Sequence, residues 1–239
     1  MSAVVQFLDW DSRFFGFGVA RILCDTPTAD EVRTALDQCR TAGARLVYWH
    51  APYHDLAAHQ LAEQHKAWLA DRKVTFAMAL GPVEAAPVDA AIVPTTTLTP
   101  QLESLAWQSG EYSRFALDKR LPADAFRQLY SQWLRNSLNG AIARVVLTLP
   151  DHTGKELGLL TLGEKNGRAD IGLLAVDAQA RGQRVGKRLV AEARRWAIGA
   201  GYTELQVVTQ RDNAPACGFY ESCGFAISYE EHIYHLWLE

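Results

Sequence analysis

The segment from Arg181 to Lys187 has the residue types and the glycine spacing of a site that binds phosphate. It follows an apolar stretch that ends in Leu174-Ala175-Val176, and it runs directly into an amphipathic stretch rich in Leu and Ala. At such a strand-to-helix junction, successive backbone N–H groups converge and the helix dipole adds partial positive charge. The segment therefore predicts a phosphorylated ligand. The simpler alternative is a glycine loop that only turns a strand into a helix.

Two common phosphate loops do not fit these residues. A Walker A loop has the pattern G-x-x-x-x-G-K-[ST], whereas Gly182 and Gly186 are one residue too close and Arg188 replaces the hydroxyl that binds magnesium. A dinucleotide fingerprint has G-x-G-x-x-G early in a βαβ unit. The glycines here have a different spacing and lie late in the chain, so both interpretations are excluded.

A third pattern fits. The segment resembles the acyl-CoA loop of the GCN5-related N-acetyltransferases (GNAT), R/Q-x-x-G-x-G/A, and it reads Arg181-Gly182-Gln183-Arg184-Val185-Gly186. The departure is Arg184, which stands where the family usually has glycine. Backbone amides would hold the phosphate, so an outward side chain at Arg184 is tolerable if its φ stays negative, because only glycine adopts positive φ freely. The Arg184 guanidinium could also add a contact to a phosphate.

A second signature follows a predicted strand at residues 203–210. The family has an Asn, an Ala three residues on, and then L/F-Y-E-x-x-G-F; this chain has Asn213, Ala216, Phe219, Tyr220, Glu221, Gly224 and Phe225. The resemblance covers about residues 95–239. It implies that Asn213 and Ala216 bind the cofactor and that Tyr220 is a general acid. The residues alone also allow a helix N-cap for Asn213 and a core tyrosine for Tyr220.

The resemblance also implies a fold and a cofactor. The fold class is α/β (α+β in some schemes), with a mixed, mostly antiparallel sheet and splayed central strands. Acetyl-CoA would lie in the gap, with its pantetheine along Leu174, Ala175 and Val176 and its pyrophosphate on the amides of Arg181, Gly182, Gln183, Arg184, Val185, Gly186 and Lys187. An amine would attack in a ternary complex, a backbone N–H near Leu174 would polarise the carbonyl, and Tyr220 would protonate the leaving thiolate.

Motifs spread along the chain resemble one subfamily more closely, the dTDP-fucosamine acetyltransferases. These motifs are Trp10-x-x-x-Phe14-Phe15-Gly16, Ser113-Arg114-Phe115, Tyr130-x-x-Trp133 and Ile171-Gly172-Leu173-Leu174-Ala175. The resemblance implies a substrate amine on a dTDP-linked amino-deoxysugar. Arg114 would then meet a nucleotide phosphate and Phe115 the apolar face of the sugar. A surface ion pair and plain core packing are the alternatives.

The composition of the chain gives no indication of a nucleic-acid, membrane or metal partner. The chain has 239 residues and a net charge of −3, which gives no reason to expect nucleic acid or a membrane. Its histidines and cysteines lack metal-ligand spacing, so we expect no metal and free thiols at Cys24, Cys39, Cys217 and Cys223. The N-terminus lacks the features of a signal peptide. We therefore expect a cytoplasmic protein with a small-molecule amine as partner, and a homodimer is left open.

The chain divides into two expected modules. Residues 1–85 read as strand, strand, helix, strand, helix, strand, without either signature, and we interpret them as a degenerate GNAT-like half. Residues 90–239 would form the catalytic domain, after a linker rich in Pro, Ala and Thr. Within these modules we expect a loop at residues 111–115 and strands at 74–80, 90–93, 141–149 and 233–238.

The resulting hypothesis is an acetyl-CoA-dependent N-acetyltransferase that acts on the 4-amino group of a nucleotide-linked deoxysugar. An acetyltransferase for another small amine or an antibiotic is one alternative, and a non-catalytic acyl-CoA-binding sensor is the other. The amine also needs a base. Asp71, Glu111 and Glu164 are carboxylates that could serve, but each reads equally as a surface residue, and the sequence assigns none of them.

Overall fold

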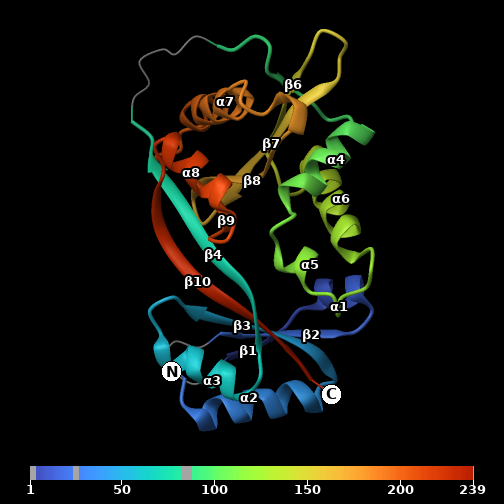
Figure 1. Cartoon of the computed structure of the whole chain (residues 1–239), viewed down its shortest axis with the longest axis vertical. Helices are drawn as coiled ribbons and strands as arrows, with labels where there is room; N and C mark the ends of the chain where they lie inside the picture. The colour runs from blue at the N-terminus through green and yellow to red at the C-terminus, as the bar shows by residue number, and fades with distance from the viewer. Residues whose placement is uncertain (1–3, 24–26, 82–87, 239) are drawn as a thin grey trace.

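The computed structural model describes residues 4–23, 27–81 and 88–238. The protein is built around one continuous sheet. Within these residues the strand order is β1-β2-β3-β10-β4-β9-β8-β7-β6-β5 (Figure 1). Pairing is antiparallel except for β2 with β3 and β8 with β9. The strands are β1 (Val4–Phe7), β2 (Gly18–Leu23), β3 (Ala44–Pro52), β4 (Trp68–Ala79), β5 (Val93–Pro94), β6 (Val145–Pro150), β7 (Glu156–Lys165), β8 (Arg168–Val176), β9 (Glu204–Gln210) and β10 (Ala226–Trp237).

Helices begin where the sequence supplies capping residues. A capping box begins the helix that follows Thr28, because the Thr28 side chain accepts from Glu31 N and the Glu31 carboxylate accepts from Thr28 N. Asp55, Thr99 and Asn213 cap three further helices. The helices are α1 (Asp9–Phe15), α2 (Ala29–Thr41), α3 (Leu56–Gln64), α4 (Pro100–Ser109), α5 (Arg114–Leu117), α6 (Ala125–Leu138), α7 (Val185–Gly199) and α8 (Ala214–Ser222), with a short 3₁₀ turn at Ala178–Ala180.

Different helices cover the two halves of the sheet. α2 and α3 cover β2, β3 and the end of β10, around Val47 and Trp49. At the other half, α7 and α8 cover one face and α4 and α6 the opposite face. The C-terminal strand β10 lies between β3 and β4, so the sheet runs without a break across the predicted module boundary. The division into two modules stays a prediction.

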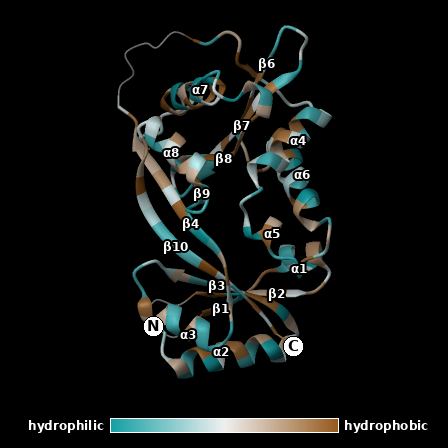
Figure 2. Cartoon of the chain, viewed as in Figure 1, coloured by the Kyte–Doolittle hydropathy of each residue, from teal (hydrophilic) through white to brown (hydrophobic). Residues whose placement is uncertain are grey.

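Several element boundaries predicted from sequence are wrong. β4 begins at Trp68 rather than Val74, and β10 begins at Ala226 rather than Ile233. The sequence pattern did not predict the full length of either strand because the middle residues of both are charged. Figure 2 shows these residues as hydrophilic bands on the two strands. The two strands pair with each other, and Lys73 Nζ lies 2.9 Å from Glu231 Oε1 across them. Cross-strand ion pairs of this kind make charged residues acceptable in a central strand.

Smaller errors concern short segments. The strand expected at 90–93 is reduced to Val93–Pro94, and the strand expected from residue 141 begins at Val145. The expected loop at 111–115 contains the start of α5, where the Ser113 hydroxyl accepts a hydrogen bond from Ala116 N. Cys39, Cys217 and Cys223 are free thiols, as predicted, while Cys24 lies outside the described residues.

Candidate active site

The two central strands splay apart, as predicted. β8 and β9 pair in parallel only at Ala169, Asp170 and Ile171, opposite Leu205, Gln206 and Val207. Beyond Ile171 a bulge shifts the register of β8 against β7, where Leu173 N donates to the Thr161 hydroxyl at 2.8 Å. A bulge adds one unpaired residue and bends its strand. This bend turns the rest of β8 away from β9 and opens a gap between them.

The open edge of β8 presents backbone groups to this gap. Asp177 N donates to Leu157 O at 2.9 Å, which marks a hydrogen-bonded pair at the end of the β7–β8 ladder. Pairs alternate along an antiparallel ladder, so Leu174 and Val176, opposite Leu160 and Gly158, have backbone groups that face away from β7. The Leu174 N–H is therefore directed into the gap, as the sequence hypothesis requires of a group that polarises a carbonyl.

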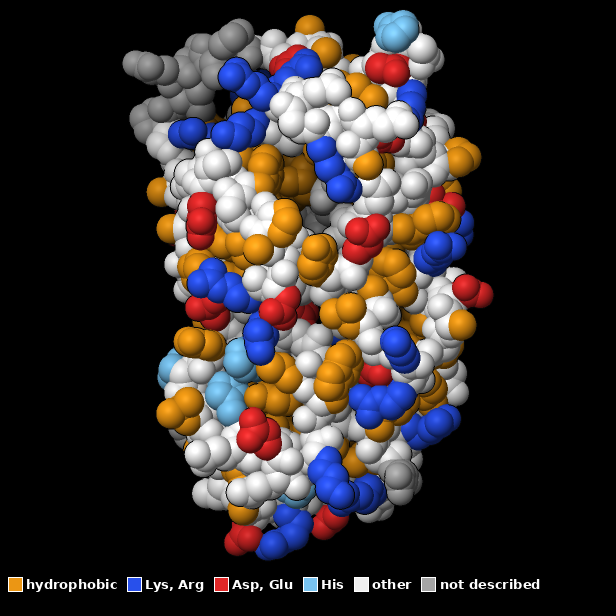
Figure 3. Space-filling model, in the orientation of Figure 1, with side chains coloured by type: hydrophobic (Ala, Val, Ile, Leu, Met, Phe, Trp, Pro, Cys, Tyr) orange, Lys and Arg blue, Asp and Glu red, His pale blue; other side chains and the backbone are white. Residues whose placement is uncertain are grey.

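A cavity of about 550 Å³ fills the gap. Figure 3 shows a hollow in the upper half of the face, with hydrophobic side chains inside and basic side chains at its rim. Gln183 does not line this cavity. The predicted cofactor and catalytic residues that do line it are Leu174, Ala175, Val176, Arg181, Gly182, Arg184, Val185, Gly186, Lys187, Asn213, Ala216 and Tyr220. Gln108, Tyr130 and Trp133, which the sequence hypothesis did not assign, also line it.

The loop before α7 leaves backbone N–H groups unused. Among the described residues, the amides of Arg184, Val185, Gly186 and Lys187 have no hydrogen-bond acceptor. They form the first turn of α7, where the helix dipole adds positive charge. Gly186 permits close packing here, because a Cβ would lie 3.1 Å from the Phe219 ring. The loop thus has the geometry of an anion site.

Arg184 does not meet the condition of a negative φ. Its φ is +62°, in the left-handed region, as is that of Gly182 at +79°. Arg184 is the N-terminal cap of α7, and its carbonyl accepts from Arg188 N at 3.0 Å. The turn from β8 into α7 therefore requires a left-handed backbone, which glycine provides in the family pattern. In this chain Arg184, which has a Cβ, adopts that conformation instead.

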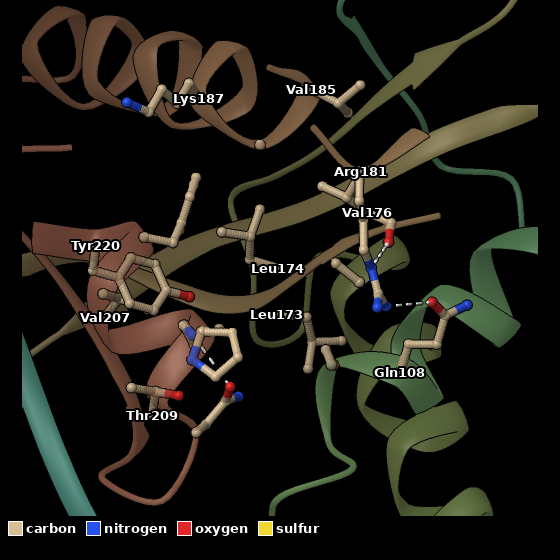
Figure 4. A pocket seen from close by; sticks show the side chains of 18 of the residues that line it. Gln108, Leu173, Leu174, Val176, Arg181, Val185, Lys187, Val207, Thr209 and Tyr220 are labelled. Carbon is tan, nitrogen blue, oxygen red and sulfur yellow. Dashed lines mark hydrogen bonds between the residues drawn. The ribbon is translucent and has the colours of Figure 1, made fainter. Parts of the chain in front are cut away.

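Arg181 adds a side chain to the cavity wall. Its Nε donates to Val176 O at 3.3 Å and its Nη2 donates to Gln108 Oε1 at 3.3 Å, as the dashed lines in Figure 4 show. One side chain thereby joins the end of β8 to α4. A guanidinium in this position places positive charge between the loop and the open edge of β8.

Tyr220 points its hydroxyl toward the cavity from α8 (Figure 4). The ring is 6% exposed and packs against Phe76, Phe219 and Phe225, with centroid separations of 5.8, 5.3 and 5.8 Å. Among the described residues its hydroxyl has no hydrogen-bond partner. Burial raises the pKa of Tyr220, and Cys223 and Cys217 add to the effect. The phenol therefore keeps its proton at neutral pH, so it can donate that proton but cannot serve as a base.

Asn213 confirms the capping interpretation and also faces the cavity. Its Oδ1 accepts from Ala216 N at 3.2 Å, which caps α8 ahead of Pro215. Because this bond uses Oδ1, the amide NH₂ group stays available as a donor. The cap holds α8, and with it Tyr220, at a fixed position relative to the end of β9.

Comparisons with known proteins agree with this geometry. The model of the acetyltransferase (GNAT) family matches residues 100–225. Over 231 residues the chain is 30% identical to dTDP-fucosamine acetyltransferase from Escherichia coli O6:H1, covering 93% of each chain. The chain belongs to the GNAT acetyltransferase family. It is an acetyltransferase.

Two further relatives bear on this GNAT chain. It is 29% identical over 133 residues to the spore coat polysaccharide biosynthesis protein SpsD from Bacillus subtilis, which is 56% of this chain and 45% of that protein. A GCN5-related N-acetyltransferase from Sphaerobacter thermophilus has the same fold, with a TM-score of 0.65 at 18% identity over 98% of this chain and 76% of that one.

Arg114 and Phe115 do not line the cavity. Arg114 stacks on the rings of Tyr48 and Phe115, at 3.8 and 4.3 Å from the centroids, and its Nη1 donates to His235 Nε2 at 3.1 Å. His235 Nδ1 lies 2.7 Å from Asp118 Oδ2. Burial lowers the pKa of His235 to about 4, so the ring is neutral, donates from Nδ1 to Asp118 and accepts at Nε2.

The partners of Arg114 come from distant parts of the sequence. Tyr48 lies on β3, His235 on β10 and Asp118 at the end of α5. The sequence hypothesis did not assign these residues, and no local motif marks them. Together they hold the Arg114 guanidinium in one orientation, and its remaining N–H groups are donors for an anion.

No group of His, Cys, Asp or Glu side chains in residues 4–23, 27–81 and 88–238 has the arrangement of a metal site. No helix in these ranges is long and apolar enough to cross a bilayer.

Proposed function

We propose that this protein transfers the acetyl group of acetyl-CoA to the 4-amino group of a nucleotide-linked amino-deoxysugar. The observation that carries the proposal is the gap between β8 and β9, which has unused amides at one end and the protonated Tyr220 along its wall. The relative that is similar over 93% of both chains is named as a dTDP-fucosamine acetyltransferase, and this supports a dTDP-linked amino sugar as the substrate.

The cavity fits an acyl-CoA. The free amides from Arg184 to Lys187, with Arg181 beside them, would hold the diphosphate. The Leu174 N–H would donate to the thioester carbonyl oxygen, and the exposed edge of β8 would pair with the amides of the pantetheine. Acetyl-CoA supplies the activated acetyl group. These residues orient it, and the sheet and helices on both sides restrict water.

Tyr220 would act as the general acid. Its phenol keeps a proton at neutral pH and has no partner among the described residues that competes for it. It would give this proton to the coenzyme A thiolate as the C–S bond breaks. Replacing Tyr220 by Phe removes only the hydroxyl, so we expect kcat to fall by roughly 10²–10⁴-fold with the Kd for acetyl-CoA unchanged.

The test is a substrate panel. Purified protein is incubated with acetyl-CoA and with dTDP-4-amino-4,6-dideoxygalactose, aminoglycosides or polyamines, and the products are identified by mass spectrometry. Acetylation of the dTDP sugar alone supports the proposal, while preference for an antibiotic or a polyamine contradicts it. Retained acetyl-CoA binding without turnover of any amine would favour an acyl-CoA-binding sensor instead. Full activity of Tyr220→Phe would remove Tyr220 from the mechanism.

Arg114 and Phe115 are the substrate-binding residues of this proposal. We expect Arg114→Lys to raise KM for the nucleotide sugar and to leave KM for acetyl-CoA unchanged. A lysine keeps the charge but loses the planar stack on Tyr48 and the fixed fork of donors. Equal KM values for the sugar in parent and variant would contradict this role.

A further inference from the structure

One buried carboxylate near the cavity has an oxygen without a hydrogen-bond donor. Asp71, on β4, is 8% exposed, and among the described residues its Oδ1 has no partner. An unsatisfied polar atom in a protein interior costs stability and commonly has a functional reason. Asp71 was one of the three carboxylates that the sequence offered without deciding between them.

The register of the sheet places Asp71 just beyond the end of β9, beside residues that line the cavity. The β4–β9 ladder ends where Lys73 pairs with Gln210. Asp71 precedes Lys73 by two residues, so both side chains lie on the same face, just beyond the end of β9. This face is opposite the one covered by α7, since Val74 and Phe76 pack on the α7 and α8 side. An amine must approach from this side, because the loop before α7 holds the other end of the cavity.

Cavity-lining residues adjoin Asp71 directly. Gln210 lines the cavity, and its side chain is near enough to Asp71 to lower the pKa of that carboxyl. Tyr130, from α6, also lines the cavity, and the charge of Asp71 helps to raise the pKa of its phenol. The carboxylate therefore lies behind the part of the wall that α6 and the end of β9 form together.

The charges that face Asp71 keep it ionised at neutral pH. Burial raises its pKa to about 6, while Arg114 on α5 and Lys73 on β4 oppose this rise and Glu231 on β10 adds to it. A carboxylate with this pKa is charged at pH 7 and is a much better proton acceptor than an exposed one.

We propose that Asp71 is the general base of the acetyl transfer, and this inference rests on the proposed function. The amine lone pair forms the N–C bond with the acetyl carbon, and the nitrogen gives one proton to the Asp71 carboxylate, directly or through one water. The C–S bond then breaks, and the thiolate takes its proton from Tyr220. Asp71 loses the proton to solvent and Tyr220 regains one, so the products are the acetamide and free coenzyme A.

The other carboxylates do not fit this role. Asp71 does not itself line the cavity, but it lies beside Gln210 and Tyr130, which do. Glu111 and Glu164 are exposed, and Glu164 accepts from the Tyr202 hydroxyl. Asp170 is half-buried, and desolvation raises its pKa too, but its Oδ1 accepts from Gln206 Nε2 at 2.8 Å. Asp170 therefore serves as the control: a half-buried carboxylate in the same sheet whose Oδ1 has a hydrogen-bond donor.

The experiment compares Asp71→Asn with Asp170→Asn. We expect Asp71→Asn to lower kcat by roughly 10²–10⁴-fold with an unchanged Kd for acetyl-CoA, and Asp170→Asn to keep the activity of the parent. In the parent, the plot of kcat against pH should have an acidic limb with an apparent pKa near that of Asp71, at about 6. This limb should disappear in Asp71→Asn and return, shifted, in Asp71→Glu.

The outcomes separate this inference from the proposed function. A parent without activity on any amine contradicts the proposed function. An active parent whose kcat and acidic limb survive in Asp71→Asn overturns the role of Asp71 alone. If Asp71→Asn does not fold, as judged by circular dichroism, the parent and Asp71→Glu decide: an acidic limb identical in position in both contradicts the proposal.

Discussion

Arg184 offers a direct test of the loop geometry, because its φ of +62° is one that residues with a Cβ rarely adopt. The left-handed conformation costs such a residue about 1–2 kcal/mol, whereas glycine adopts it without that cost. Glycine also loses about 0.5–1 kcal/mol through the greater freedom of the unfolded chain. The difference predicts that Arg184→Gly raises the free energy of unfolding by about 0.5–1 kcal/mol.

The variant Arg184→Ala distinguishes the effect of backbone strain on stability from the effect of losing the positive charge. Arg184→Ala removes the guanidinium but keeps the strained backbone, so it should be less stable than Arg184→Gly by about that same amount. For a chain of this length, 1 kcal/mol shifts Tm by about 2–4 °C. Urea unfolding followed by circular dichroism, together with thermal scans, would measure both differences. Both variants should lose the same part of the salt dependence of acetyl-CoA binding, because both lose one cation.

The adjacent residue supplies the control. Gln183 lies in the same loop and is not among the residues with positive φ. Gln183→Gly should therefore destabilise the protein, as glycine normally does. The reasoning is refuted if Arg184→Gly and Arg184→Ala have equal unfolding free energies, or if Gln183→Gly stabilises the protein as much as Arg184→Gly does.

Three further predictions follow from packing and burial. Gly110→Ala should lower the free energy of unfolding by about 1–3 kcal/mol, measured by urea unfolding, because its Cβ would lie 2.1 Å from the Tyr130 ring. Thr161→Val should cost about 1–3 kcal/mol in the same assay, since it leaves the buried Leu173 N–H at the bulge without an acceptor; an unchanged urea midpoint would contradict this. Asp71→Asn should stabilise the protein at pH 7 by up to about 3 kcal/mol, because burial raises the folded-state pKa of Asp71 from 3.8 to about 6. The folded state then binds more protons between these values, so the gain should grow from pH 4 to pH 6 and level off above; a gain independent of pH would be inconsistent with the shift.

The candidate cofactor side of the site is built from residues that are close together in the sequence. The segment from β8 through α7 is contiguous, and its strand, glycine loop and helix are determined by neighbours in sequence. The capping residue Asn213 likewise fixes the start of α8 and, through the helical repeat, the direction of Tyr220. Such features need no long-range contact, so the sequence indicates them directly.

The acceptor side could not be predicted in the same way. Trp68 to Lys73 carry charges that argue against a central strand, and they become one only because β10 pairs beside them and supplies Glu231. The sequence left the backbone of Arg184 open for a related reason. Its φ is set by how β8 must join α7 after the bulge, and this geometry overrides the local preference of arginine.

The amino-acid sequence by itself determined the family, the phosphate loop and the candidate acid, because each depends on residues within one strand–loop–helix segment. Only the tertiary structure brought together the side chains that we propose for the amine side of the site. β10 returns from the C-terminus to lie between β3 and β4, and this pairing brings His235 to Arg114 and Glu231 toward Asp71. Strand order depends on the burial and register of the whole sheet, and these are properties that no short stretch of residues encodes.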